Sequence, residues 1–162
     1  MKKYLFLFNL LIFICNVNAF AQCNIKTNNR PDGVTVNYMN PDMVGKGSSC
    51  ELGLSISTDG SDFYLNTTVL YLSSPKKISG DLIIELSNSK SLVLELYTSE
   101  LATMKGSEVS VSVFFLRSSD VNELASNKIK KIVFKESSGK NQIIIVSQNS
   151  DLVSKQLKCL RQ

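Results

Sequence analysis

The segment 50–69 constrains the fold of this chain most, because it joins two alternating stretches through a strong turn signal. In its first half, apolar residues occupy every second position, which is the period of a strand with one buried face. Asp59-Gly60 follows and is among the strongest signals for a two-residue turn. If Thr58 pairs with Ser61, apolar side chains meet on one face of a β-hairpin. The predicted pairs are Ile56 with Phe63, Leu54 with Leu65, Leu52 with Thr67, and Cys50 with Val69.

Two further hairpins are predicted in the same way. Residues 81–86 and 92–97 alternate, and a three-residue loop, Asn88-Ser89-Lys90, aligns their apolar positions. A third hairpin is expected over residues 132–145, with Ser138-Gly139 in its turn. The predicted pairs are Leu86 with Leu92, Ile84 with Leu94, Leu82 with Leu96, Phe134 with Ile143, and Ile132 with Ile145.

The expected fold is mainly β. Alternating stretches at 34–38 and 109–115, with a segment after Cys23, bring the expected total to about nine strands. Residues 120–125 predict a short helical turn, and residues 150–160 predict a C-terminal α-helix with one apolar stripe. Short strands joined by polar turns and followed by one terminal helix indicate an antiparallel β-sandwich or an open barrel, with the helix as a lid.

Residues 1–21 have the features of a complete export signal. Lys2-Lys3 supplies the charged start, residues 4–15 form an apolar stretch, and Ala19-Phe20-Ala21 supplies the small residues before the cleavage site. The apolar stretch is shorter than the roughly 20 residues of a membrane span. Cleavage would leave residues 22–162 as a single β domain in the periplasm or outside the cell. Losing two lysines would lower the formal charge from +4 to +2, which argues against a nucleic-acid partner.

Three cysteines would remain after cleavage: Cys23, Cys50 and Cys159. Three thiols allow one disulfide and one free cysteine. Domain termini often lie close together, which slightly favours a bridge between Cys23 and Cys159. A bridge from Cys50 to either of the other two stays almost equally open. No two cysteines are close enough in sequence to form a metal-ligand pair.

The chain contains no histidine, so it lacks the most common general base and metal ligand. Nucleotide-binding and nucleophile motifs are absent from the sequence as well, and we expect no cofactor, no metal and no enzymatic activity. Glycoside hydrolysis by two carboxylates is a remote alternative. The predicted second hairpin makes Glu85 and Glu95 diagonal neighbours, with backbones roughly 7–8 Å apart.

Candidate binding residues lie on the outer face of the first predicted hairpin. There the pairing places Tyr64 opposite Ser55 and Asn66 opposite Gly53, within a polar strip that also contains Glu51. Such a strip suits a glycan or a loop of a partner protein. An aromatic ring beside a glycine can also simply protect a sheet, which is the structural alternative.

A second candidate surface comes from strands with apolar side chains on both faces. The residues concerned are Leu70, Tyr71, Leu72, Phe114 and Leu116. Strands of this kind are covered on both sides, here either by the terminal helix or by a partner protein. We therefore add Leu70, Leu72 and Phe114 to the candidate binding residues.

The run from Ser79-Gly80-Asp81 to Leu96, followed by residues 116–132, resembles small exported β-rich proteins of unassigned function from Gram-negative bacteria. The resemblance is one of pattern over about the last half of the chain. It implies an accessory protein of the bacterial envelope or a secreted one, and it implies no site residue. The expected function is non-enzymatic binding of another envelope or secreted protein through a partly apolar β surface. A small-ligand or glycan-binding β module is the alternative.

Overall fold

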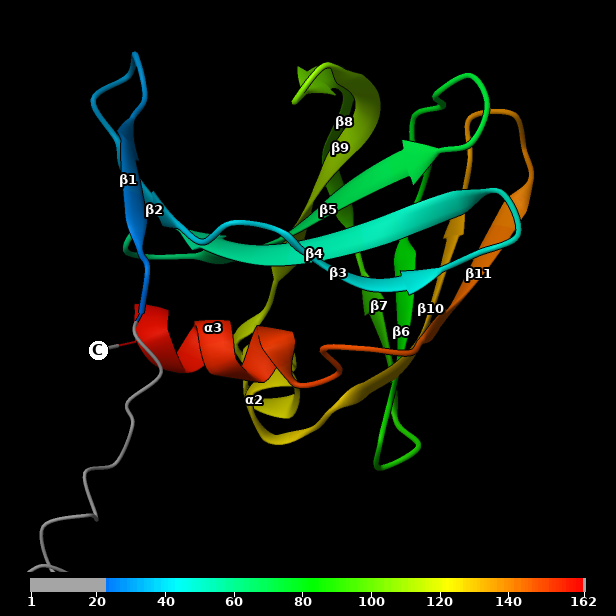
Figure 1. The fold of residues 1–162 in the computed structure, drawn as a ribbon. Coiled ribbons are helices and arrows are strands. Elements are labelled where there is room, and N and C mark those ends of the chain that lie inside the picture. Colours follow the sequence, from blue (N-terminus) through cyan, green and yellow to red (C-terminus); the bar gives the residue numbers. More distant parts are fainter. Residues whose placement is uncertain (1–22, 162) are drawn as a thin grey trace, which may run out of the picture.

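The computed structural model describes residues 23–161, so the predicted export signal lies outside the described residues. These residues form a mainly β structure with eleven strands and two helices (Figure 1). The strands are β1 (Lys26–Asn29), β2 (Thr35–Tyr38), β3 (Asp42–Lys46), β4 (Cys50–Thr58), β5 (Phe63–Tyr71), β6 (Leu82–Leu86), β7 (Ser91–Leu94), β8 (Leu96–Met104), β9 (Ser107–Leu116), β10 (Ile129–Lys135) and β11 (Asn141–Val146). The helices are α2 (Ser118–Ser126) and α3 (Leu152–Leu160), so both predicted helices are confirmed.

The sheet curls into a nearly closed antiparallel barrel. Its strand order is β7-β6-β10-β11-β3-β4-β5-β9-β8. β7 and β8 are successive parts of one strand interrupted at Glu95; the first part pairs with β6 and the second with β9. Because the two parts of this strand stand at opposite ends of the strand order, the sheet nearly closes on itself. Of the two predicted architectures, the barrel is therefore the one found.

A separate hairpin of β1 and β2, here called the β1–β2 arm (residues 26–38), extends from the barrel (Figure 1). The arm joins the barrel sheet only where Asn37 and Tyr38 pair with the end of β4. Its base is tied to α3 by a disulfide between Cys23 and Cys159, whose Cα atoms lie 5.6 Å apart. The favoured pairing of cysteines is thus confirmed, and Cys50 is a free, buried thiol.

The barrel interior is packed with leucine, isoleucine and phenylalanine side chains, and both helices contribute to this core. α2 and α3 lie together beneath β4 in Figure 1. Gln156 of α3 joins the helix to the sheet, because its Oε1 accepts a hydrogen bond from the backbone N–H of Ile56 at 2.7 Å. Ser154 Oγ donates to the carbonyl of Ala125 at 2.6 Å and joins α3 to α2. The terminal helix is therefore a lid on the core, as predicted.

The first hairpin forms, but its register differs from the predicted one by two residues. Thr58 pairs with Phe63, which leaves a four-residue loop instead of a two-residue turn. The side chain of Asp59 builds this loop, since its Oδ1 accepts the backbone N–H groups of Ser61 at 3.1 Å and Asp62 at 2.9 Å. A shift of two residues keeps every side chain on its predicted face.

The second hairpin shows the same kind of error. Its loop has three residues, as predicted, but it comprises Ser87, Asn88 and Ser89, because the backbone N–H of Leu86 donates to the carbonyl of Lys90 at 2.8 Å. Ser89 has a φ of +65°, a left-handed conformation that the loop requires. The register again moves by two residues, so Ile84 pairs with Leu92 and the core face is retained.

The third hairpin differs by one residue, which exchanges the two faces of β11. Ile132 pairs with Ile144, and Phe134 pairs with Gln142. The loop has three residues because Glu136 N–H donates to the carbonyl of Lys140 at 2.8 Å. Gln142 therefore points into the interior, whereas Ile143 and Ile145 are exposed. The predicted pairing of Phe134 with Ile143 is wrong for this reason.

Candidate functional site

The predicted binding residues fall into four groups in the structure. Tyr64 and Asn66 line one hollow on the outer surface, and Glu51 and Leu70 line another. Leu72 lies outside both hollows and is 76 % exposed. Phe114 is 0 % exposed and belongs to the barrel core, so it is not available to a partner. Its neighbour Phe115 takes the outer face, because adjacent residues of a strand point to opposite sides.

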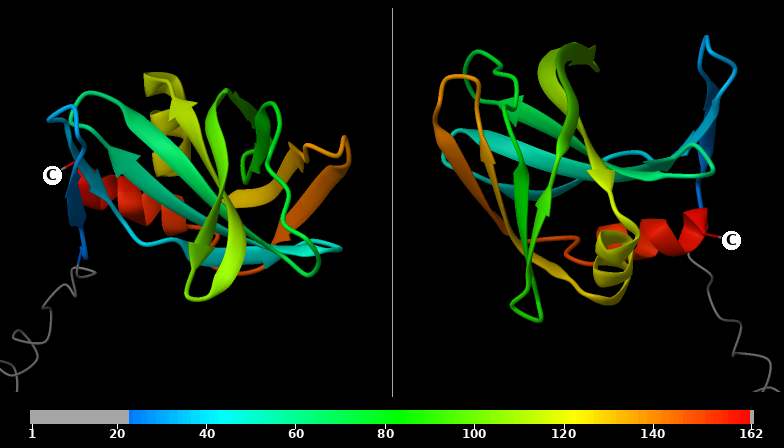
Figure 2. Two further views of the ribbon diagram at one scale, coloured as in Figure 1. Left: turned by 90° about the horizontal axis from the view of Figure 1, so that it is seen from above. Right: turned by 180° about the vertical axis from the view of Figure 1, so that it is seen from behind.

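The two hollows share no lining residue but lie on the same hairpin, and together they are here called the trough: the hollow of about 630 Å³ is its wide end and the hollow of about 180 Å³ its narrow end. Both have the β4–β5 hairpin as their floor. At both ends, one wall comes from the β1–β2 arm, extended at the wide end by residues 40–43, and the other from β8 and β9. Figure 2, seen from above, shows β4 and β5 lying between the arm and the β8–β9 hairpin. The trough therefore brings together three segments that are distant in sequence.

The narrow end is built around aromatic rings. Tyr64 lies 6.0 Å from Tyr97 and 6.1 Å from Phe115, measured between ring centroids, and both pairs are tilted or edge-on. This geometry is typical of favourable aromatic contacts. Tyr64 comes from β5, Tyr97 from β8 and Phe115 from β9. Tyr97 is largely exposed and presents its ring to solvent.

Polar groups surround these rings. The hydroxyl of Tyr64 donates to Asp59 Oδ2 at 3.1 Å, and the amide of Asn66 donates to Ser57 Oγ at 3.0 Å. The backbone N–H of Asp62 is the main cause that lowers the pKa of the Asp59 carboxyl, so this group is a hydrogen-bond acceptor at neutral pH. Partial burial is the main cause that raises the pKa of Tyr64, and the hydrogen bond to Asp59 is the second cause. Tyr64 therefore stays a hydroxyl that can donate a hydrogen bond. Arg30 adds a guanidinium on the wall of this end.

The predicted neighbours of these residues are corrected by the observed register. Tyr64 lies opposite Ser57 and Asn66 opposite Ser55, so the predicted pairs of Tyr64 with Ser55 and of Asn66 with Gly53 are wrong, and the ring does not lie beside Gly53. The residue opposite Gly53 is Thr68. Gly53 lies on the floor of the wide end, and its lack of a side chain leaves space there. An added Cβ would lie 3.4 Å from the carbonyl oxygen of Asp42.

The wide end combines one apolar side chain on a mixed floor with methionine and lysine side chains on its walls. Leu70 lies on the floor, with Met43 on one wall and Met104 on the other. Lys26 and Lys105 stand on opposite walls, and within residues 23–161 neither forms an ion pair. Glu51 is neutralised by Lys46 at 2.5 Å. This end can hold an apolar group between two cationic side chains.

Glu85 and Glu95 do not form the carboxylate pair expected for glycoside hydrolysis. Glu85 lies opposite Ser91, four positions from Glu95, which separates their backbones by about 13 Å along the strand. Glu85 instead forms an ion pair with Lys131 at 2.5 Å. The hydrogen bond from Lys131 is the main cause that lowers the pKa of Glu85, whereas a general acid needs a raised pKa.

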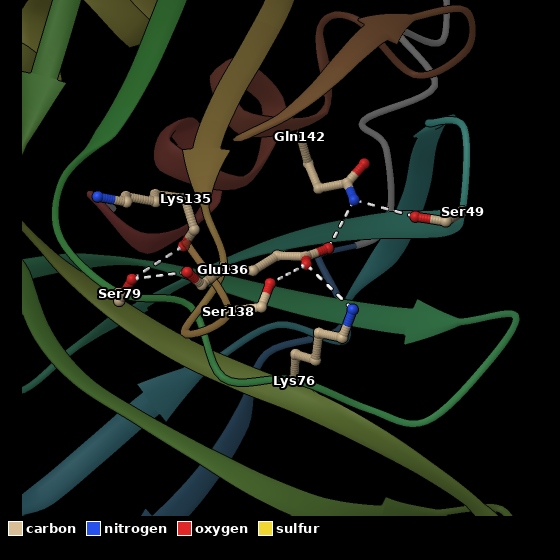
Figure 3. A network of polar contacts seen from close by, with 7 residues as sticks. All are labelled: Ser49, Lys76, Ser79, Lys135, Glu136, Ser138 and Gln142. Atoms are coloured by element: carbon tan, nitrogen blue, oxygen red, sulfur yellow. Dashed lines mark hydrogen bonds and ion pairs between the residues drawn. The ribbon is translucent and has the colours of Figure 1, made fainter. Parts of the chain in front are cut away.

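Sequence reasoning missed a buried carboxylate at the barrel end opposite the helices. Glu136 is 0 % exposed and lies at the start of the β10–β11 loop (Figure 3). Its Oε1 accepts from Gln142 Nε2 at 2.5 Å, and its Oε2 accepts from Ser138 Oγ at 2.8 Å and pairs with Lys76 Nζ at 3.4 Å. The amide of Gln142 also donates to Ser49 Oγ at 2.9 Å.

This buried network joins three segments: the β3–β4 turn, the loop after β5 and the β10–β11 hairpin. Glu136 lines neither end of the trough. A nearby thiol, Cys50, has a raised pKa, first because of burial and then because of the Glu136 charge. Only the residue types could have indicated this network. The sequence pattern did not, because a glutamate next to a turn is ordinarily exposed. Its contacts indicate a structural role.

A scan of known protein families and searches of characterised proteins and solved structures gave no match. Among residues 23–161, no helix has the length and apolar character to cross a membrane. Within the same residues, no group of three or more acidic or cysteine side chains is arranged to hold a metal ion.

Proposed function

We propose that this chain is an exported, non-enzymatic binding protein that holds a segment of another envelope or secreted protein in the trough. The observation that carries the proposal is the trough itself. Its wide end of about 630 Å³ lies within the range of about 300–1,000 Å³ that is usual for ligand sites. Four of the six candidate binding residues line the trough, which agrees with a binding role for the outer face of the first hairpin.

The chemistry of the wide end supports a polypeptide as the occupant. The apolar side chains of Leu70, Met43 and Met104 lie among polar and charged residues here, and apolar groups within a polar rim are the usual anatomy of a protein interface. Met43 and Met104 are flexible, so the two walls can adapt to an aliphatic side chain placed above Leu70. Lys26 and Lys105 would pair with acidic residues that flank this side chain. The expected partner segment is thus aliphatic at its centre and acidic at its sides.

Export to the periplasm or beyond is part of the proposal. The disulfide between Cys23 and Cys159 supports it, because such bonds persist in oxidising compartments and are rare in the bacterial cytosol. The export signal predicted over residues 1–21 agrees with this location.

Affinity capture from lightly crosslinked cells tests the proposal, with Leu70→Asp and Leu72→Asp as matched variants. Leu70 lies on the floor of the trough, whereas Leu72 is exposed outside it. Wild-type protein and Leu72→Asp are expected to enrich the same partner, and Leu70→Asp is expected to lose it. Thermal melting checks that both variants fold. Equal recovery by the two variants would exclude the trough as the binding surface.

Glycan binding at the narrow end is the second candidate, favoured by the exposed ring of Tyr97 beside the polar groups of Asp59 and Asn66. Its volume of about 180 Å³ is below the range of about 300–1,000 Å³ that is usual for ligand sites, so this end would take only a small part of a glycan. Binding to a glycan array should survive Tyr97→Phe, which keeps the ring, and decrease in Tyr97→Ala, which removes it. Unchanged binding in Tyr97→Ala would dismiss this candidate site.

A further inference from the structure

The connection from β5 to β6, residues 72–81, is here called the strap. It joins two strands that are not neighbours in the sheet, and it contains no helix or strand of its own. Most of its residues are exposed, but Ile78 is 2 % exposed and belongs to the core. The strap contributes only an isolated bridge, between Ile78 and Glu136, so it can move without disrupting the pairing of the barrel strands.

The strap is attached mainly to the β10–β11 hairpin. The backbone N–H of Ser79 donates to the carbonyl of Lys135 at 2.8 Å. The backbone N–H of Ser137 donates to the carbonyl of Lys77, also at 2.8 Å. Ser79 Oγ donates to the carbonyl of Glu136 at 3.0 Å (Figure 3). Two further hydrogen bonds go elsewhere, both at 3.0 Å: from the N–H of Ile78 to Ser99 Oγ, and from the N–H of Leu72 to the carbonyl of Ser49.

One charged contact joins the strap to the buried carboxylate. Lys76 Nζ lies 3.4 Å from Glu136 Oε2, and the side chain of Lys76 is 37 % exposed whereas that of Glu136 is 0 % exposed. Among residues 23–161, Lys76 is the cation that forms an ion pair with Glu136. Burial of a carboxylate is unfavourable unless a cation and hydrogen-bond donors compensate for its charge. The closed position of the strap and the charge of Glu136 therefore support each other.

Two buried side chains, Cys50 and Tyr71, lie at the same end of the barrel. They face each other across β4 and β5 and are 1 % and 7 % exposed. Cys50 lies beside the buried network, because a Cβ added at Gly47 would be 3.4 Å from its Sγ and 3.5 Å from Gln142 Oε1. Within residues 23–161, the Tyr71 hydroxyl has no hydrogen-bond partner. Such a hydroxyl is unfavourable when buried, so access of water to Tyr71 would favour an open strap.

We propose that the charged Glu136 holds the strap closed over this end of the barrel, and that acid opens the strap and exposes Cys50 while the barrel stays folded. The ionisable groups around Glu136 and Cys50 are Lys76 from the strap, Tyr71 from β5 and Lys140 from the β10–β11 loop. Burial is the main cause that raises the pKa of Cys50 and of Tyr71, so neither loses a proton at neutral or acidic pH. Glu136 is therefore the group that responds to acid.

The direction of the pH effect follows from the hydrogen bonds of Glu136. With the strap closed, burial opposes ionisation, but bonds from Gln142, Ser138 and Lys76 outweigh it and lower the pKa of Glu136. With the strap open, the contact with Lys76 is lost and water reaches the carboxyl, so its pKa returns towards about 4.3. Protons therefore bind the open form more tightly. The closed form is lost as the pH falls from about 4.3 through the lower pKa of the closed form.

Labelling of the Cys50 thiol by 4,4′-dithiodipyridine, measured from pH 7 to pH 3, tests the proposal. The thiol attacks the disulfide of the reagent, forms a mixed disulfide and releases 4-thiopyridone, whose absorbance gives the rate. Each rate is divided by that of the urea-unfolded chain at the same pH, and Cys50→Ser gives the background. The ratio should rise at least about tenfold between pH 7 and pH 3. Its dependence on urea should be weaker than that of global unfolding, because opening the strap exposes little surface.

Two lysines of the strap provide matched variants. Lys76→Met removes the cation that pairs with Glu136, whereas Lys77→Met changes an exposed neighbour that forms no ion pair within residues 23–161. At pH 7, Lys76→Met should be labelled about tenfold faster than the wild type, because the buried carboxylate loses its cation. Lys77→Met should be labelled at the wild-type rate. Should Lys76→Met fail to fold, the wild-type pH series still decides.

Three results would overturn this proposal: a labelling ratio that does not change with pH, equal rates for the two methionine variants, and labelling with the urea dependence of global unfolding. The third would show that Cys50 becomes exposed only when the barrel unfolds. No residue of the strap lines the trough, so these results and those for the trough are independent.

Discussion

Glu136 is the residue at which this structure departs furthest from ordinary expectation, because its carboxylate is buried and charged. Burial opposes ionisation, but hydrogen bonds from Gln142, Ser138 and Lys76 outweigh it and hold the pKa of Glu136 below its usual value. A carboxyl whose pKa is lower in the folded chain stabilises the fold above its unfolded pKa, which is about 4.3 for glutamate. This stabilisation is lost as the pH falls through the lower, folded pKa.

Glu136→Gln should lower the free energy of unfolding by about 2 kcal/mol at pH 7, because the amide cannot accept every donor that surrounds it. The difference from wild type should start to shrink below about pH 4 and disappear as the pH falls through the lower, folded pKa, where the wild-type carboxyl becomes protonated as well. Urea unfolding at pH 7 and pH 3 measures both quantities. Glu108→Gln, at an exposed glutamate, is the control and should change little. An equal difference at both pH values would contradict a charged Glu136.

At the scale of single elements, the β10–β11 hairpin provides the clearest test of the observed register. Ile144 is buried in the core, whereas Ile143 next to it is exposed. Ile144→Ala should lower the free energy of unfolding by about 2–5 kcal/mol, because it leaves a cavity. Ile143→Ala should change it by no more than about 0.5 kcal/mol. Urea unfolding compares the two variants, and a larger loss for Ile143→Ala would support the register expected from the sequence instead.

The β1–β2 arm is an element that depends on its disulfide. Two residue pairs join it to β4, and the bond between Cys23 and Cys159 ties its base to α3. Replacing both cysteines by serine should lower the free energy of unfolding by about 2–5 kcal/mol. Hydrogen exchange should speed up first in residues 26–38, since the arm has few other contacts.

A reducing agent should reproduce this effect in the wild type and have no additional effect on the double-serine variant. Exchange in the arm that is unchanged by loss of the bond would show that strand pairing alone holds the arm. Such a result would mean that the arm keeps its place as a wall of the trough without the disulfide.

The elements themselves were largely predictable, and their registers were not. Alternation located three hairpins, since a buried face requires it, and the apolar stripe located α3, whereas the β1–β2 hairpin, β3 and the β8–β9 hairpin were not predicted. Loop geometry then decided each register through contacts that composition does not contain, such as the backbone bonds to Asp59. In the third hairpin, Glu136 and Gln142 are buried together, so a polar residue occupies a core position of β11. The rule that apolar residues occupy core positions predicted Ile143 there instead.

At the scale of the whole molecule, barrel closure and the trough arise from contacts between distant segments. The trough floor was predicted in part, because Tyr64, Asn66, Glu51 and Leu70 lie on one face of the first hairpin. Its walls were not, since the position of the β1–β2 arm and the curl of β8 and β9 follow from tertiary packing. Phe114 was misassigned because it belongs to the face of β9 that points into the core, whereas the outer face, with Val113 and Phe115, is only half-buried.

The central claim is that the trough holds a partner protein, and site-specific photocrosslinking in intact cells tests it most directly. A photoreactive residue at position 70 lies on the floor of the trough, and the same residue at position 72 lies outside it. The account predicts a discrete crosslinked protein from position 70 and none from position 72. A crosslink from position 72 alone, or the same product from both positions, would contradict it.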